Sequence, residues 1–142
     1  MKQPLVNWAF HLGDVPDAYR CDYDDSAWRR VCAPHDWQIE QPRSADAPQG
    51  SAQGYYPRNQ IGWYRARVQI PQQMRGRALT LWFDALMQDS QVWINGHLLG
   101  RRPYGYVPVI EPIDAWVRFG AENTIAVRLD CTCGGDRWYS GA

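Results

Sequence analysis

Hydrophobic and polar residues alternate with a period of two along much of the chain, most regularly in its second half. In residues 64–70, apolar side chains alternate with two arginines and a glutamine, and the same period recurs in residues 79–83 and 124–129. Successive side chains of a strand point to opposite faces of a sheet, so this period predicts strands with one buried face. Residues 8–12 and 28–32 are further strand candidates with a weaker pattern.

A hairpin signal lies between two short apolar runs. Residues 91–94 and 97–100 flank the dipeptide Asn95-Gly96. A tight two-residue hairpin turn needs positive φ at both central residues, which asparagine and glycine adopt readily. The two runs are therefore predicted to pair as antiparallel strands.

Helical signals are sparse. Residues 22–28 and 113–118 could each form one turn, but neither has an apolar stripe long enough for a packed helix. Residues 38–56 are rich in Pro, Gly, Ser, Ala and Gln without periodicity, which predicts a long surface loop. Seven or eight short strands between turns predict an all-β fold, a β-sandwich with jelly-roll topology in preference to an immunoglobulin-like one.

Length and charge limit the classes of protein to consider. The 142 residues fit one domain, residues 1–142, and 15 basic residues balance 15 acidic ones. A nucleic-acid-binding protein would need a basic face, and no apolar run approaches the roughly 20 residues that cross a bilayer. We therefore expect no nucleic-acid partner and no membrane span. The first dozen residues lack a signal-peptide core, which leaves a cytoplasmic or periplasmic location open, and the four cysteines are expected to be free thiols.

No motif in the chain marks a catalytic centre. Gly50-Ser51 lacks the Gly-x-Ser-x-Gly order of a hydrolase nucleophile. The dipeptide His35-Asp36 suggests part of a triad, but adjacent side chains on a strand point to opposite faces. Glycoside hydrolysis needs two positioned carboxylic acids, and the three glutamates stand in no special context (Glu40, Glu111 and Glu122). The scattered histidines and Cys131-Thr132-Cys133 lack the spacing of a metal site (His11, His35 and His97). We expect no catalytic residue, no metal and no cofactor.

Aromatic residues are the unusual part of the composition, at 13% of the chain with eight tryptophans. They gather with Arg and Asp in residues 101–106, after the predicted hairpin, and in residues 134–139, after the last predicted strand. Flat apolar rings beside directed polar groups suit sugars, but they also suit loop packing and cross-strand contacts. Packing explains the pair Asp136 and Arg137, in a glycine-led loop, least well.

A series of collinear motifs over about residues 14–142 resembles the N-terminal sugar-binding domain of glycoside hydrolase family 2, in its β-galactosidase branch. The motifs include Asp24-Asp25-Ser26, Pro34-His35-Asp36-Trp37, Ile61-Gly62-Trp63-Tyr64-Arg65, Trp93-Ile94-Asn95-Gly96, Arg102-Pro103-Tyr104-Gly105-Tyr106 and Arg137-Trp138-Tyr139-Ser140-Gly141. The resemblance implies a jelly-roll domain that precedes an immunoglobulin-like domain and a (β/α)₈ barrel. In this family the barrel carries the catalytic glutamates and hydrolyses β-galactosides with retention. A barrel alone takes about 250 residues, so we expect the chain to be a non-catalytic piece of a larger hydrolase.

The resemblance also implies roles for individual residues. Asp136 and Arg137 would reach the glycone subsite from the loop after the last strand and contact a β-galactoside-type carbohydrate, which the piece alone would bind weakly. Five other residues would hold the domain against the barrel and the immunoglobulin-like domain of its parent chain (His35, Asp36, Arg102, Tyr104 and Tyr106). Two alternatives stay open: a free-standing carbohydrate-binding module, and a purely structural domain that braces the barrel.

Overall fold

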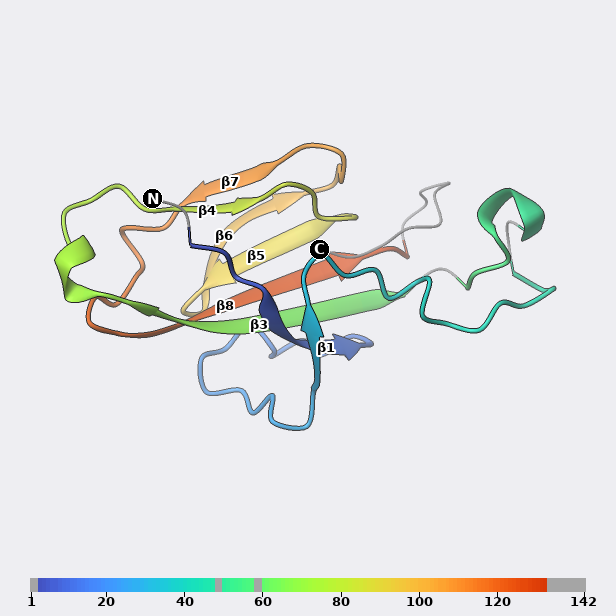
Figure 1. Ribbon diagram of the computed structural model, residues 1–142, viewed down its shortest axis with the longest axis horizontal. Coiled ribbons are helices and arrows are strands. Elements are labelled where there is room, and N and C mark those ends of the chain that lie inside the picture. The colour runs from blue at the N-terminus through green and yellow to red at the C-terminus, as the bar shows by residue number, and fades with distance from the viewer. Residues whose placement is uncertain (1–2, 48–49, 58–59, 133–142) are drawn as a thin grey trace.

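The protein is built almost entirely from antiparallel β-strands, which form two facing sheets. The computed structural model describes residues 3–47, 50–57 and 60–132. The larger sheet has six strands in the order β2-β1-β3-β8-β5-β6, and β4 and β7 form the smaller sheet. Figure 1 shows the smaller sheet lying over β5 and β6. The prediction of an all-β sandwich is confirmed, whereas the jelly-roll topology stays a prediction.

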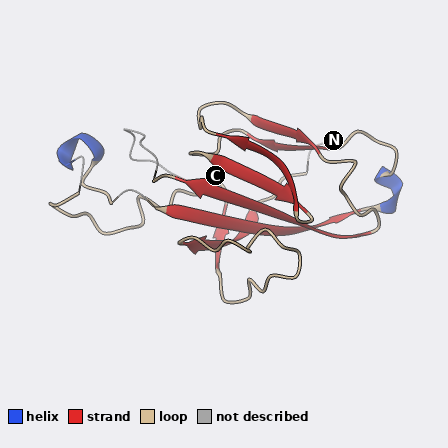
Figure 2. Ribbon diagram, turned by 180° about the vertical axis from the view of Figure 1, so that it is seen from behind, coloured by secondary structure: helices blue, strands red, loops and turns tan. Residues whose placement is uncertain are grey.

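The elements have short, well-defined bounds. The strands are β1 Asn7–Leu12, β2 Arg29–Cys32, β3 Ile61–Ile70, β4 Thr80–Phe83, β5 Ser90–Ile94, β6 His97–Arg102, β7 Val109–Pro112 and β8 Ala121–Asp130. Two 3₁₀ turns, η1 Gly50–Gln53 and η2 Gln72–Met74, lie at opposite ends of the molecule, as seen from behind in Figure 2.

The predicted strands are all confirmed, including both weaker candidates. Asn95 and Gly96 have φ of 49° and 84°, so the predicted turn joins β5 to β6. Residues 113–118 form a single turn closed by the Val117 amide on the Ile113 carbonyl at 3.2 Å. The sequence pattern did not indicate β7, and the predicted loop 38–56 contains η1.

The central strands of the large sheet, β3, β8 and β5, are largely buried on both faces. On the inner face, Tyr64, Val92 and Val127 pack in one core cluster with Leu81 and Val109 of the smaller sheet. On the outer face, residues 13–28 form a loop that covers a second cluster around Trp63 and Trp93. Figure 1 shows this loop, in light blue, beneath β3.

This second cover corrects the expectation that β3 has one polar face. Arg65, predicted to be exposed, is only 1% exposed. Its Nε donates to Asp25 Oδ2 at 2.8 Å, and its Nη1 donates to the Arg20 carbonyl at 3.0 Å. A buried guanidinium is tolerated when a carboxylate and carbonyl oxygens take its donors. The loop of residues 13–28 supplies both.

No disulfide joins the two sheets among the described residues. Cys21 and Cys32 are free thiols, and Cys131 Sγ donates to the Met87 carbonyl at 3.6 Å. Cys133 lies outside the described residues. The packed cores described above hold the two sheets together instead.

Candidate functional site

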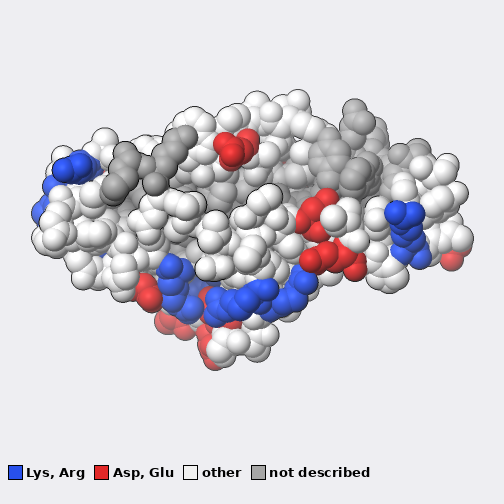
Figure 3. Space-filling view, viewed as in Figure 1, with Lys and Arg blue, Asp and Glu red and all other residues white. Residues whose placement is uncertain are grey.

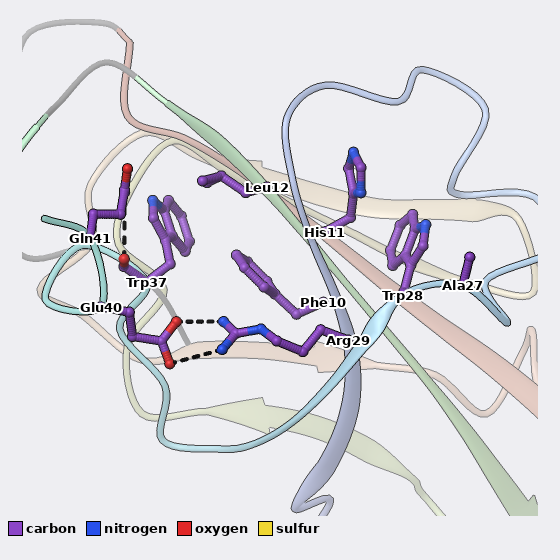
Figure 4. A pocket seen from close by; sticks show the side chains of 9 residues that line it. All are labelled: Phe10, His11, Leu12, Ala27, Trp28, Arg29, Trp37, Glu40 and Gln41. Carbon is purple, nitrogen blue, oxygen red and sulfur yellow. Dashed lines mark hydrogen bonds and ion pairs between the residues drawn. The ribbon is translucent and has the colours of Figure 1, made fainter.

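A hollow of about 420 Å³ lies where β1 and β2 separate. The β1–β2 ladder ends at the pair Phe10 and Arg29, whereas β1 continues along β3 as far as the pair Leu12 and Gly62. The edge of β1 therefore borders a notch that the loop after β2 closes from the far side. Figure 4 shows the lining side chains, which are Phe10, His11, Leu12, Ala27, Trp28, Arg29, Trp37, Glu40 and Gln41.

Aromatic rings form two walls of this hollow. Phe10 and Trp37 stack with centroids 5.6 Å apart, and His11 stacks on Trp28 at 5.3 Å. Phe10, Trp28 and Trp37 are all buried, so their ring faces are used mainly in packing. The hollow is thus rigid at its walls, and its polar chemistry comes from its rim.

The rim carries a compact ionic cluster centred on Glu40. Arg29 Nη1 donates to Glu40 Oε1 at 3.2 Å, and Arg29 Nη2 donates to the other carboxylate oxygen, as the dashed lines in Figure 4 show. His35 Nε2 lies 3.2 Å from Glu40 Oε2. A fork of two donors on one carboxylate fixes the orientation of both groups.

The cluster is anchored to the central sheet through His35. The side chain of His35 is largely buried, and its Nδ1 lies 2.6 Å from the Tyr64 hydroxyl on β3. Phe10 contacts the same imidazole edge-on, with centroids 4.8 Å apart. The loop after β2 is therefore fixed to β1 and β3 by one histidine.

Glu40 is held in its ionised form, in which its carboxylate accepts hydrogen bonds and has no proton to donate. Hydrogen bonds from Arg29 and, secondarily, from His35 hold the pKa of the Glu40 carboxyl below its ordinary value of 4.5, against the opposing effect of partial burial. A carboxyl that stays ionised near neutral pH cannot act as a general acid. Retaining glycoside hydrolysis needs two carboxyl groups about 5–5.5 Å apart, and the lining of this hollow holds one. The hollow can bind and orient a group, but its lining has no catalytic pair.

Replacing Glu40 by glutamine should lower stability modestly and only above acidic pH. The folded-state pKa is depressed, so the ionised carboxylate contributes stability above its ordinary value of 4.5, and the contribution is lost as pH falls through the folded-state pKa. Arg29 is 53% and Glu40 39% exposed, so solvent screening limits the expected loss to about 1 kcal/mol near pH 7. Urea unfolding of both proteins near pH 7 and near pH 3 measures the difference.

Glu122→Gln is the matched control for this experiment. Glu122 is 53% exposed and its Oε1 lies 3.6 Å from Arg67 Nε, so the change should have little effect at either pH. An equal loss for Glu40→Gln at both pH values would mean that packing, and not the charge of Glu40, carries its contribution.

Packing of Trp37 against β3 depends on a glycine. A Cβ built on Gly62 would lie 2.7 Å from Cζ3 of the Trp37 ring. Only glycine allows the indole to approach the strand so closely. The motif residue Gly62 thus positions the loop that carries His35 and Glu40.

The predicted interface residues fall into two groups. His35 belongs to the ionic cluster, and Asp36 Oδ1 accepts from the Gln38 amide at 2.9 Å in a tight turn. Arg102 Nη2 donates to the buried Glu111 at 2.6 Å. Tyr104 and Tyr106 are exposed on the loop between β6 and β7, with ring centroids 5.4 Å apart.

The two groups approach the same end of the large sheet, where β8 ends. Trp37, next to Asp36, packs on Gly62, which pairs with Leu129 near the end of β8. Gly105 lies so close to Met87 that an added Cβ would be 2.6 Å from the Met87 sulfur. Gln88, the residue after Met87, is bound to the end of β8, because its carbonyl accepts from the Asp130 amide at 2.9 Å. Asp136 and Arg137, the predicted sugar-contacting residues, follow this end in sequence but lie outside the described residues.

Arg29 and Glu40 are the functional candidates that the sequence did not reveal. They are eleven residues apart and belong to a strand and a loop, so no local spacing marks them as a pair. The nearest signal was the Pro34-His35-Asp36-Trp37 motif between them.

Two further features concern cofactors and membranes. In the described part of the chain, no group of three His, Cys, Asp or Glu side chains is placed to hold a metal ion. None of the helices among these residues has the length and apolar character to span a bilayer.

Comparison with known proteins identifies the family. No family model matches the chain. It is 37% identical over 137 residues to a β-galactosidase of Bacteroides ovatus, covering 96% of this chain and 16% of that protein. It is 40% identical over 124 residues to a putative β-glucuronidase of Formosa agariphila, covering 87% of this chain and 12% of that protein.

The fold agrees with this assignment. A glycosyl hydrolase family 2 member from Bacteroides cellulosilyticus matches with a TM-score of 0.87 and 34% identity, over 96% of this chain and 19% of that one. The chain thus spans less than a fifth of the length of each of these relatives. The chain belongs to glycoside hydrolase family 2, in which it corresponds to the N-terminal domain.

Proposed function

We propose that this chain is the non-catalytic N-terminal domain of a retaining β-galactosidase-like hydrolase and contributes a loop to its glycone subsite. The observation that carries the proposal is the coverage: nearly the whole chain matches, but it corresponds to only 16% of a β-galactosidase. The hollow described above, with one carboxylate in its lining, is in keeping with a supporting role. In this proposal Asp136 and Arg137 contact the sugar.

Two buried donors support a contact surface next to the predicted interface residues. Trp37 Nε1 and Gln38 Nε2 are buried without a hydrogen-bond partner among the described residues. An unsatisfied buried donor costs about 1–3 kcal/mol, so a partner from elsewhere in a larger protein would be favourable here. Both residues directly follow Asp36, one of the residues proposed to contact the barrel or the immunoglobulin-like domain.

The loop between β6 and β7 supports the second half of the same surface. Tyr104 is 59% exposed, and Gly105 fixes the loop against Met87 between the two tyrosines. Arg102 is held by Glu111 at the base of the loop. Exposed tyrosines on a fixed loop combine apolar area with a polar edge, which suits a domain interface.

A β-glucuronidase is the second candidate for the whole protein. The Formosa agariphila relative, at 40% identity, is a putative β-glucuronidase. A uronic acid carries a carboxylate that an arginine can bind through two parallel hydrogen bonds. Arg137 would suit such a glycone, and parallel assays with aryl β-galactoside and aryl β-glucuronide separate the two candidates.

In the full-length protein, Arg137→Ala should lower kcat/KM by about 10- to 150-fold. Charge-assisted hydrogen bonds in a closed site contribute roughly 1.5–3 kcal/mol, and each 1.4 kcal/mol is a factor of ten. The melting temperature should not change, because the residue follows β8, the last strand among the described residues, which ends at Asp130. Steady-state kinetics and thermal unfolding of the same variant test the proposal.

Arg77→Ala provides the control, since Arg77 is an exposed arginine in the turn before β4. It should leave both quantities unchanged. A stable Arg137→Ala protein with wild-type kinetics would remove this residue from the site. A lower melting temperature with unchanged kcat/KM would favour the alternative of a purely structural domain.

A further inference from the structure

The edge of β1 has one residue in the hollow whose backbone groups lack a strand partner. The Gly13 amide donates to the Ile61 carbonyl at 2.7 Å, toward β3. Backbone groups along an antiparallel strand point alternately to its two sides, so those of the preceding residue, Leu12, point away from β3. The β1–β2 ladder has already ended, at the pair Phe10 and Arg29. Among the described residues, no backbone group binds the amide or the carbonyl of Leu12 on this side.

Aromatic rings flank this free edge on both faces of the sheet. Phe10 and Trp37 belong to the core between the two sheets. Trp28 belongs to the cluster on the outer face, and His11 stacks on it at 5.3 Å. Figure 4 shows all four rings around the hollow. Successive side chains of an extended segment point to opposite faces, so a segment beside β1 would place one side chain against the first pair of rings and the next against the second. Both positions suit an apolar side chain.

The charged groups at the rim of the hollow are paired with each other. Arg29 donates to both carboxylate oxygens of Glu40, and His35 lies beside the same carboxylate. In Figure 3, positive and negative side chains likewise adjoin along the lower side of the view. An ionic ligand would have to break the fork between Arg29 and Glu40, so the hollow favours an uncharged occupant.

One wall of the hollow holds a buried donor without an acceptor. Trp37 is 1% exposed, and its Nε1 has no hydrogen-bond partner in the described chain. Figure 4 shows its ring between Leu12 and Gln41. Buried polar groups of folded proteins are nearly always hydrogen-bonded. A polypeptide backbone would supply both missing partners, because its N–H and C=O groups match the free edge at Leu12 and a further carbonyl can accept from the indole.

We propose that an extended segment of the parent protein, from outside these 142 residues, binds in the hollow as a short strand on the free edge of β1, with two successive apolar side chains against the rings. The inference rests on the proposed function, in which the chain is one domain of a larger hydrolase. The chain corresponds to 16% of the Bacteroides ovatus β-galactosidase, so most of a protein of that kind lies outside it.

The size and place of the contact favour a segment of the same protein over a free peptide or a second copy. Leu12 offers one donor and one acceptor, which is too little for a separate peptide to bind tightly. A segment joined to the domain through the chain is present at an effective concentration on the order of millimolar. The edge is also recessed between the rings and the loop that carries Glu40, so the flat face of a second sheet would not reach it.

Hydrogen exchange of single amides tests the pairing. We expect the Leu12 amide to exchange fast in the 142-residue chain and about a hundredfold or more slowly in the full-length protein. The Gly13 amide should be slow in both, which shows that β1 is folded. Arg30 is the matched control. The Ala33 amide donates to the Val6 carbonyl at 2.9 Å, so by the same alternation the Arg30 amide points away from β1, at the outer edge of the sheet, and should be fast in both.

Photo-crosslinking identifies the occupant. Ala27 is exposed and lines the hollow. In the full-length protein, p-benzoylphenylalanine in its place should crosslink to a segment of the same chain outside residues 1–142 that has two successive apolar residues. The same probe in place of Ala115, an exposed residue in the turn before β8, should give no crosslink to that segment. Thermal unfolding verifies that both variants are folded.

Five results would overturn the inference. They are fast exchange of Leu12 in the full-length protein, slow exchange of Leu12 already in the 142-residue chain, a crosslink within residues 1–142, no crosslink at all, or a crosslink to a second copy, which would assign the free edge to self-association. Neither measurement depends on hydrolysis. An active full-length protein with an unprotected Leu12 would contradict this inference alone, whereas one that protects Leu12 but hydrolyses no β-galactoside would contradict the proposed function alone.

Discussion

Asp25→Ala should lower the free energy of unfolding by about 3–5 kcal/mol, because it leaves a buried arginine without its counter-ion. Asp25 and Arg65 are both almost fully buried, at 3% and 1% side-chain exposure. Arg67 Nη1 donates to the other carboxylate oxygen at 2.8 Å. Removing the carboxylate would leave one guanidinium charged in the protein interior and release a second one at its edge.

The titration of Asp25 gives the same prediction a pH dependence. Burial raises the pKa of the Asp25 carboxyl, but hydrogen bonds from Arg65 and Arg67 outweigh burial and hold it below the ordinary value of 3.8. The carboxylate therefore contributes stability above that value, and the contribution is lost as pH falls through the folded-state pKa. The difference between wild type and Asp25→Ala should shrink in acid.

Chemical unfolding near pH 7 measures the effect, with Asp22→Ala as control. Asp22 pairs with Arg20 at 3.0 Å, but both side chains are more than half exposed. Such surface pairs contribute about 0–1 kcal/mol. Similar losses for the two variants would show that the buried pair is no more stabilising than a surface one.

The acidic member of the ion pair between Asp25 and Arg65 lies close in sequence to one wall of the hollow. Asp25 lies in the loop that covers the outer face of the large sheet, three residues before Trp28. The Trp28 amide donates to the backbone carbonyl of Asp25 at 3.0 Å, so the acid that binds Arg65 belongs to the same turn as the tryptophan that forms one wall of the hollow. Alanine at position 25 keeps this carbonyl, so Asp25→Ala should disturb the hollow only through the loss of the side-chain contact with Arg65 that fixes the loop.

The strands that sequence could predict have apolar side chains at successive inward positions. β8 has three of them, Ile125, Val127 and Leu129, and β5 has two, Val92 and Ile94. The Asn95-Gly96 turn adds a signal for the β5–β6 hairpin that depends only on local backbone geometry.

β7 breaks this pattern. Val109 and Glu111 point inward, while Ile110 and Pro112 are exposed. A polar residue of β7 therefore points inward and an apolar one points outward, the reverse of the usual pattern. The buried Glu111 carboxylate is stabilised by the hydrogen bond that Arg102 donates to it.

The site was less predictable than the fold because its partners meet through tertiary packing. His35 could be singled out from its motif, but its contacts with Tyr64 and Glu40 join a strand and a loop separated by up to 29 residues. Arg65 shows the same limit, since an alternating arginine predicts an exposed face until a loop elsewhere supplies Asp25. A period-2 pattern is a property of one strand and can be seen in its sequence, whereas a buried ion pair depends on two segments that meet only in the folded protein.

Asn123→Ala should destabilise the protein by about 3 kcal/mol, because one fully buried amide satisfies several backbone and side-chain groups. Asn123 is 0% exposed. Its Nδ2 donates to the carbonyls of Arg118 and Ala121 at 2.9 and 3.0 Å. Its Oδ1 accepts from the Asn95 side chain and from the Arg118 amide, both at 2.7 Å.

The two buried asparagines join the β5–β6 turn to the loop before β8. Asn95 Nδ2 also donates to the Trp116 carbonyl at 2.9 Å, and Asn95 Oδ1 accepts from the Thr124 amide at 3.0 Å. Alanine at 123 would remove the shared amide and leave donors and acceptors on both segments without their partner. The loss should therefore exceed the roughly 1 kcal/mol of a single hydrogen bond.

Asn7→Ala is the control, since Asn7 is an exposed asparagine on β1 whose Oδ1 takes only a weak contact from the Cys32 thiol at 3.7 Å. Its expected effect lies within about 0.5 kcal/mol. Urea unfolding of both variants gives the two free energies. If Asn123→Ala lowered the free energy of unfolding no more than Asn7→Ala does, the loop before β8 would not depend on the Asn123 amide. Water would then have to replace this amide without cost.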